Sequence, residues 1–171
     1  TEKNKDTEKT SNDNIKSKNS NQEPVKAIIS DDKYYKLGKD LMTKDPEESF
    51  ANFLKSADLG NVKAQLRVAI SYQSGINGAK KNIEEANKYY KLAADQGNIK
   101  AQCNLAFNMQ KGDGIKKDLK GANDLYKKSA DNGYSIAQFN YAYNLMNGIG
   151  IDKDYKEATR YFKLAADQGL S

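Results

Sequence analysis

The sequence predicts an all-α fold, a right-handed α-solenoid of stacked antiparallel helix pairs. The first reason is a phrase ending in glycine that recurs every 36 or 37 residues, at Gly60, Gly97, Gly133 and Gly169. The second is that apolar residues between these glycines are spaced three and four apart, which is the period of a helix with one buried face. A fixed period of this length is the signature of a repeat array, because one helix pair cannot bury its own apolar face.

The chain is expected to divide into a tail and four structural units. Residues 1–29 are predicted to be a disordered tail, since Ile15 is the only apolar residue before Pro24 and a polar segment cannot offset the entropy of ordering. A short apolar patch at 25–29 could dock on the first helix. The solenoid is predicted over 30–171, with units at 30–60, 61–97, 98–133 and 134–169.

The first helix of each of the last three units, called helix A, is expected at 62–74, 99–111 and 135–147. Its apolar positions are Ala64, Val68, Ala69 and Tyr72 in one unit, Ala101, Leu105, Ala106 and Met109 in the next, and Ala137, Tyr141, Ala142 and Leu145 in the last. Gly75, Gly112 and Gly148 follow these helices directly, and glycine adopts the left-handed conformation of a helix C-terminus without strain.

The second helix of each unit, helix B, is expected to begin after an N-cap residue at Asn82, Asp118 or Asp154. Glu85 and Glu157 lie three residues after two of these caps, which predicts capping boxes. In the first unit, 30–60, Asp45 and Pro46 have the same role, with proline at the first helical position. That unit lacks the loop with two glycines.

These residues resemble the Sel-1-like repeat, a relative of the tetratricopeptide repeat. The resemblance rests on the Gly-x-Gly-Ile loops at 112–115 and 148–151, the acidic N-caps and the alanines and tyrosines of helix B, and it covers 61–169. Residues 30–60 are more similar to a plain tetratricopeptide unit. Alanine replaces the family's glycine at Ala69, Ala106 and Ala142, and Tyr89, Leu125 and Tyr161 replace its frequent tryptophan. The resemblance implies a scaffold or adaptor without shared catalytic residues.

The composition argues against an enzyme, a metal protein and a nucleic-acid-binding protein. The chain has no histidine, so the commonest general base and metal ligand is absent, and the single Cys103 has no partner for a disulfide or a catalytic pair. The net charge of +5 arises from interspersed charges of both signs rather than a basic block. No apolar run is long enough to span a membrane. We therefore expect no cofactor, no metal, no nucleic acid and no transmembrane helix.

Helix A offers two stripes on which a protein or peptide could bind. The polar stripe consists of Lys63, Arg67, Ser71, Lys100, Asn104, Asn108, Asn140, Asn144 and Asn147. The apolar stripe consists of Leu66, Ile70, Cys103, Phe107, Phe139, Tyr143 and Met146. We interpret the apolar stripe as packing between successive A helices, so that the polar stripe would face the groove. Its amides could bond a peptide backbone, and Lys63, Arg67 and Lys100 would attract carboxylates.

The sequence therefore favours a protein-binding adaptor and leaves two alternatives open. One is a purely structural spacer within a longer array, and the other, more remote, is an enzyme. Tyr161, Phe162 and Leu164 of the last helix have no following helix to cover them. Because terminal repeats normally present a polar surface, this end is expected to continue into further repeats or to self-associate.

Overall fold

The computed structural model describes residues 22–169, and the side chains from residue 31 onward. This part of the chain contains eight helices and no strand. The helices are α1 (Gln22–Leu41), α2 (Pro46–Asp58), α3 (Val62–Ser74), α4 (Ile83–Asp95), α5 (Ile99–Lys111), α6 (Leu119–Asp131), α7 (Ser135–Asn147) and α8 (Tyr155–Ala166). The odd-numbered helices are the A helices of four successive pairs, and the even-numbered helices are the B helices.

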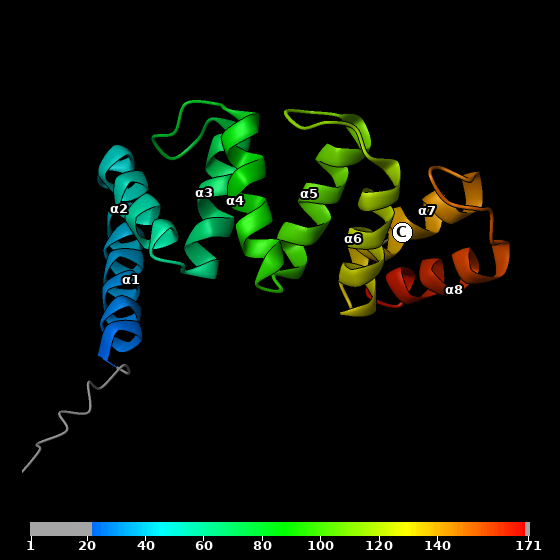
Figure 1. Cartoon of the computed structure of the whole chain (residues 1–171), viewed down its shortest axis with the longest axis horizontal. Coiled ribbons are helices and arrows are strands. Elements are labelled where there is room, and N and C mark those ends of the chain that lie inside the picture. Colours follow the sequence, from blue (N-terminus) through cyan, green and yellow to red (C-terminus); the bar gives the residue numbers. More distant parts are fainter. Residues whose placement is uncertain (1–21, 170–171) are drawn as a thin grey trace, which may run out of the picture.

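The four pairs are stacked in one row, so the array is long and thin (Figure 1). Each helix packs against its neighbours in the chain: α1 with α2, α2 with α3, and so on to α7 with α8. Contacts within a pair therefore alternate with contacts between pairs, as expected of a repeat array. The predicted fold class, an α-solenoid of stacked antiparallel helix pairs, is confirmed.

The predicted helix boundaries hold in the three repeating units but not at the first helix. The A helices at 62–74, 99–111 and 135–147 are confirmed as α3, α5 and α7. Helix α1 begins at Gln22, so residues 22–29, which we expected within the tail, are helical. Pro24 is compatible with this start, because proline is tolerated in the first turn of a helix. Residues 1–21 of the expected tail lie outside the described residues.

The predicted N-caps are confirmed, whereas the capping boxes are only half formed. The Oδ1 atoms of Asn82, Asp118 and Asp154 each accept a backbone N–H three residues later, at 3.1, 2.9 and 2.9 Å. Their own backbone N–H groups donate to carbonyls of helix A, at Tyr72, Met109 and Leu145. The donor that a capping-box glutamate would bond is therefore already used, and it ties helix B to helix A instead.

Two kinds of glycine shape the loop between helix A and helix B. Gly75, Gly112 and Gly148 end helix A in the left-handed conformation, as predicted. The second loop glycine has a further role, since a Cβ at Gly114 would lie 2.7 Å from Ile83, and one at Gly150 would overlap Leu119. Ile83 and Leu119 are the first residues of helix B in the preceding unit. Glycine thus allows each loop to lie against the unit before it.

Buried asparagines connect the units at the same place. Asn108 Nδ2 in α5 donates to Asn87 Oδ1 in α4 at 2.7 Å, and Asn87 Nδ2 donates to the Asp113 carbonyl in the next loop at 2.8 Å. The following interface repeats this chain: Asn144 donates to Asn123, and Asn123 donates to the Ile149 carbonyl. We call these four residues the asparagine ladder. It gives partners to amide N–H groups that would be costly to bury alone, although Asn108 Oδ1 is buried without a partner.

Buried glutamines of the A helices form a second set of polar contacts. The Nε2 atoms of Gln65, Gln102 and Gln138 each donate to a carbonyl at the end of the preceding helix B, at 3.1, 3.2 and 3.2 Å. Gln96 and Gln168 donate in turn to the Oε1 atoms of Gln65 and Gln138, at 2.8 and 2.9 Å. Gln102 Oε1 is buried without a partner. In its unit, Asn132 occupies the position of Gln96 and Gln168. Its side chain is one methylene shorter than glutamine and donates to the Lys128 carbonyl instead.

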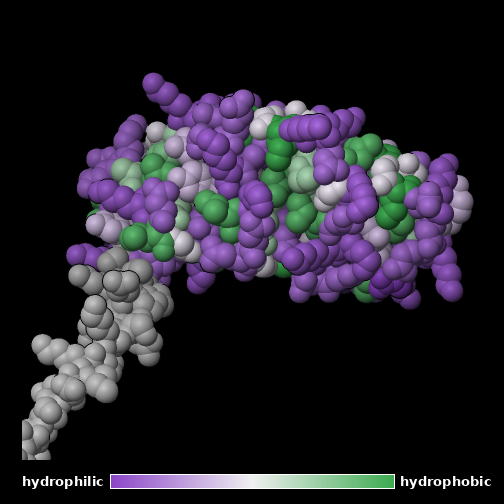
Figure 2. All heavy atoms as spheres, viewed as in Figure 1, coloured by the Kyte–Doolittle hydropathy of each residue, from purple (hydrophilic) through white to green (hydrophobic). Residues whose placement is uncertain are grey.

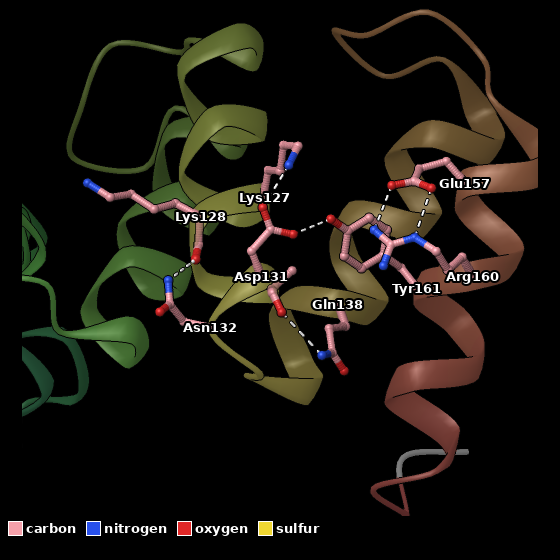
Figure 3. Close-up of polar contacts among 9 residues, drawn as sticks. Lys127, Lys128, Asp131, Asn132, Gln138, Glu157, Arg160 and Tyr161 are labelled. Carbon is pink, nitrogen blue, oxygen red and sulfur yellow. Dashed lines mark hydrogen bonds and ion pairs between the residues drawn. The ribbon is translucent and has the colours of Figure 1, made fainter.

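The last two B helices are joined by a tyrosine and a carboxylate (Figure 3). The Tyr161 hydroxyl in α8 donates to Asp131 at the end of α6, and Lys127 lies 2.7 Å from the other carboxylate oxygen. Tyr89 of α4 bonds Asp58 of α2 in the same way, at 2.7 Å. Leucine occupies the equivalent position at Leu125, so the α4–α6 contact lacks this bond.

The outer face of α8 is uncovered in the described part of the chain. Ala166 is exposed, whereas Ala94 and Ala130 at the equivalent positions are buried against the next helix A. Thr159 occupies the position of the ladder residues Asn87 and Asn123 and bonds only the Tyr155 carbonyl of its own helix. That a further repeat or a second copy covers this face stays a prediction.

Replacing Asn132 by glutamine is expected to stabilise the protein. The longer amide would reach Gln102 Oε1, as Gln96 reaches Gln65, and one satisfied buried acceptor contributes about 1 kcal/mol. The melting temperature should rise by about 3 °C in a thermal scan. Gln96→Asn is the reciprocal control and should lower it. A melting temperature unchanged in both variants would contradict the role given to this amide pair.

Replacing Asn123 by alanine is expected to destabilise the array. It leaves the Ile149 carbonyl without its side-chain donor and leaves Asn144 Nδ2 with only the longer bond to Gln110, at a cost of about 2 kcal/mol. Thr159→Ala removes a side chain from the equivalent position of α8 and should change the free energy of unfolding by less than about 0.5 kcal/mol. Urea unfolding followed by circular dichroism measures both, and equal effects would argue against the ladder.

Candidate protein-binding surface

Two hollows, each of about 250 Å³, open on the side of the array formed by the A helices. We call the exposed faces of α3, α5 and α7 the A-helix surface. Both hollows are smaller than the roughly 300–1,000 Å³ of a typical small-molecule pocket, so each suits one or two side chains of a larger ligand.

The first hollow is centred on α3. Its lining consists of Tyr35, Lys63, Leu66, Arg67, Ile70, Asn77 and Asn98. The Arg67 guanidinium lies 5.0 Å from the ring centre of Phe53, and its Nη1 is 3.4 Å from the sulfur of Met42. These contacts hold the cation against an apolar wall, while Lys63 extends into solvent.

The second hollow lies between α5 and α7. Its lining consists of Phe107, Gln110, Lys111, Tyr126, Phe139, Asn140, Tyr143 and Asn144. Lys111 Nζ lies 4.2 Å from the ring centre of Phe107, and Phe139 packs edge-on against Phe162 of α8. The hollow is thus bounded by aromatic rings with amides at its floor.

The structure divides the predicted polar stripe into two groups. Lys63 and Lys100 are exposed, and Arg67, Asn104 and Asn140 are half-buried. By contrast, Asn108 and Asn144 are 0% and 2% exposed and belong to the asparagine ladder, so they do not offer free amides to a ligand. Ser71, at the position equivalent to Asn108, is also buried, and Asn147 is exposed. Only five of the seven candidate residues lie where a bound segment could contact them: Lys63, Arg67, Lys100, Asn104 and Asn140.

The apolar stripe is not the buried seam that we expected. Ile70, Phe107 and Tyr143 occupy equivalent positions on α3, α5 and α7, and they are 38%, 40% and 49% exposed. Only Cys103 of this stripe is fully buried. The expectation was wrong because successive A helices pack mainly on the B helices between them. The apolar stripe is therefore part of the surface. Figure 2 shows one face of the molecule, on which apolar patches lie among hydrophilic side chains.

Other hollows offer weaker sites. One, of about 530 Å³, lies between α6 and the loop at Gly148–Gly150, but the amide in its lining, Asn123, is already bonded to the loop and to Asn144. No cluster of three potential metal ligands occurs among the described residues. None of the described helices combines the length and apolar character that a membrane span requires.

The comparisons with known proteins identify the repeats. The sequence model of the Sel1 repeat family matches residues 33–61, 62–98, 99–134 and 135–170. The chain belongs to the Sel1 repeat family. The match includes the first unit, which we interpreted as a plain tetratricopeptide unit because it lacks the double-glycine loop. Sel1 repeats are generally protein–protein interaction modules and non-enzymatic scaffolds. No curated protein matches the chain.

Solved Sel1-type structures share the fold. A protective antigen present in uropathogenic Escherichia coli strains, with an SLR fold, is 26% identical with a TM-score of 0.77 over 85% of this chain. A Sel1 repeat protein from Oxalobacter formigenes is 29% identical with a TM-score of 0.73 over 84%. The chain spans only 32% and 60% of these two proteins. Cysteine rich protein B of Helicobacter pylori is 22% identical with a TM-score of 0.57, covers 74% of this chain and 90% of its own, and supports the fold alone.

Cys103 is expected to be unreactive in the folded protein. It is buried, and burial raises the pKa of its thiol to about 12, while the neighbouring Asn140 side chain opposes this shift with a smaller effect. The thiol therefore stays protonated through neutral and mildly alkaline pH, and the thiolate is the reactive form. A thiol-reactive dye at pH 8 should label the protein only after urea unfolding. Fast labelling of the native protein would contradict this burial.

Proposed function

We propose that this chain is a protein-interaction module that holds a segment of a partner protein on a concave A-helix surface. The observation that supports it is the row formed by Ile70, Phe107 and Tyr143. Single exposed apolar side chains are common on protein surfaces. A row of exposed apolar side chains at the same position of three successive A helices, bordered by two hollows, is more typical of an interaction site.

The purely structural spacer is the main alternative, and this row argues against it. Stacking of the units uses the B helices, the loops and the asparagine ladder, and Tyr143 contributes its side chain to none of these contacts. A spacer would have no use for exposed aromatic rings, and polar residues would serve it better. The alternative of an enzyme has no support from a catalytic constellation among the described residues.

Peptide selection tests the proposal. A random peptide library displayed on phage is panned on the immobilised chain, and the selected peptides are synthesised and titrated. Tyr143→Ala should weaken their binding at least tenfold, or about 1.4 kcal/mol, because an exposed ring that becomes buried on binding carries much of the energy. Leu92→Ala is the matched control, since Leu92 is 47% exposed on α4 and lines neither of the two hollows. The Leu92→Ala variant should bind the selected peptides as tightly as the unaltered protein does.

The same assay separates the two classes of contact. Asn104→Ala combined with Asn140→Ala removes the half-buried amides and tests whether they bond the bound peptide. Unchanged melting temperatures would show that all these variants remain folded. If no enriched peptide depends on Tyr143, the binding proposal fails and the spacer is favoured.

A further inference from the structure

Charged side chains are distributed unequally between the last three A helices and the B helices. Helices α3, α5 and α7 contain no acidic residue, and their basic residues are Lys63, Arg67, Lys100 and Lys111. All ion pairs among residues 31–169 lie within the B helices α4, α6 and α8. Within this part of the chain, the cations of the A-helix surface thus have no carboxylate within 4.0 Å.

Three of these four cations lie toward one end of the A-helix surface, whereas Lys111 lines the second hollow. Lys63 and Arg67 line the first hollow, and Lys100 is in the first turn of the next helix A. Helix α7, at the other end, has no charged residue and contributes Phe139 and Tyr143 to the second hollow. The surface therefore changes along the array from cationic to aromatic.

Two of the cations are held in position before any ligand binds. Arg67 lies against Phe53 and Met42, and Lys111 lies over Phe107. A side chain that is already ordered loses less conformational entropy on binding. The guanidinium of Arg67 can also bond a carboxylate through two N–H groups, which favours this anion.

We propose that the A-helix surface takes a bipartite protein segment, with an acidic part on Lys63, Arg67 and Lys100 and an apolar part in the hollow between α5 and α7. This inference rests on the proposed function and adds the chemistry of the partner to it. Charge complementarity selects the acidic part, and the rings of Phe107, Phe139 and Tyr143 select the apolar part.

Two other occupants fit this surface less well. Residues 1–24 of the chain itself contain five lysines and five acidic residues but only one aliphatic residue, Ile15, so they have neither the net charge nor the apolar part. A nucleic acid would match the cations but not the aliphatic side chains of Leu66 and Ile70 beside Lys63. It is kept as an outcome of the test.

Short synthetic peptides test the inference. The glutamate peptide joins a glutamate-rich half to a half rich in leucine and phenylalanine, and it is made in both orders. In the glutamine peptide and the lysine peptide, every glutamate is replaced by glutamine or by lysine. The protein variants are Lys63→Glu with Lys100→Glu, and as control Lys80→Glu with Lys116→Glu, which places the same charge change on exposed loop residues outside both A-helix hollows. Fluorescence anisotropy measures the dissociation constants.

The glutamate peptide should bind at least tenfold more weakly to the Lys63→Glu, Lys100→Glu variant than to the unaltered protein. The control variant should bind it as tightly as the unaltered protein does. The lysine peptide should bind the Lys63→Glu, Lys100→Glu variant better than it binds the unaltered protein. Affinity for the glutamate peptide should also fall between about 0.1 M and about 1 M salt, as the Debye length falls from about 10 Å to about 3 Å.

Three outcomes would overturn the inference: a glutamine peptide that binds as tightly as the glutamate peptide, no binding of the glutamate peptide, or tighter binding of single-stranded RNA that displaces it. If the glutamine peptide binds tightly and loses affinity with Tyr143→Ala, only the acidic part of the inference fails, and the proposed function stands. If the selected peptides show no dependence on Tyr143, the proposed function itself fails.

Discussion

Each unit of the array is held to the next by a loop that lies against the first turn of the preceding helix B. The contact at Gly114 and Gly150 leaves no room for a Cβ atom, so the separation of the units is set by the absence of a side chain. At this separation Asn87 and Asn123 reach both the loop carbonyl and the asparagine of the next helix A. A larger residue at the glycine would move the loop away and lengthen all of these bonds together.

The polar groups at these interfaces fix the register of the stack more than they drive it. Burial of alanine and aromatic side chains, such as Tyr90 and Tyr126, supplies the driving force. A displaced helix would leave several amides buried without partners, each at a cost of about 1–3 kcal/mol. Two such deficits are tolerated among the described residues, at Asn108 Oδ1 and at Gln102 Oε1, the latter because Asn132 stands in place of the longer amide.

Most of the fold could be predicted from the sequence, because the signals of this fold are local and repeated. The period, the glycine caps and the Asp or Asn N-caps located seven of the eight helices closely. The start of α1 was missed, because the polar composition of residues 1–24 predicted a disordered tail and outweighed Asn21, a common N-cap residue type directly before Gln22. Nor could the sequence show that the N-cap N–H of Asn82 or Asp154 bonds helix A rather than a glutamate, since this depends on the distance between two helices.

The candidate site was predicted less well, and the reason lies in the neighbouring helix. Asn104 and Asn108 are four residues apart on one helix and look alike in sequence, yet only Asn108 meets an asparagine of α4. A signal was present, because Asn87 and Asn123 recur with the same period as Asn108 and Asn144. Residues that repeat in step on a helix B and on the next helix A are candidates for mutual contact. Arg67, by contrast, interrupts the repeat, because Asn104 and Asn140 occupy its equivalent positions.

This last distinction separates stability from binding in the array. Positions that stack the units must keep their residue type from one unit to the next, as the loop glycines and the buried alanines do. Positions on the A-helix surface carry no such constraint, so Ile70, Phe107 and Tyr143 differ in size, and α3 can be cationic while α7 is uncharged. The A-helix surface departs most from the repeat and is therefore free to match a partner, with a cationic half at α3 and an aromatic half at α7.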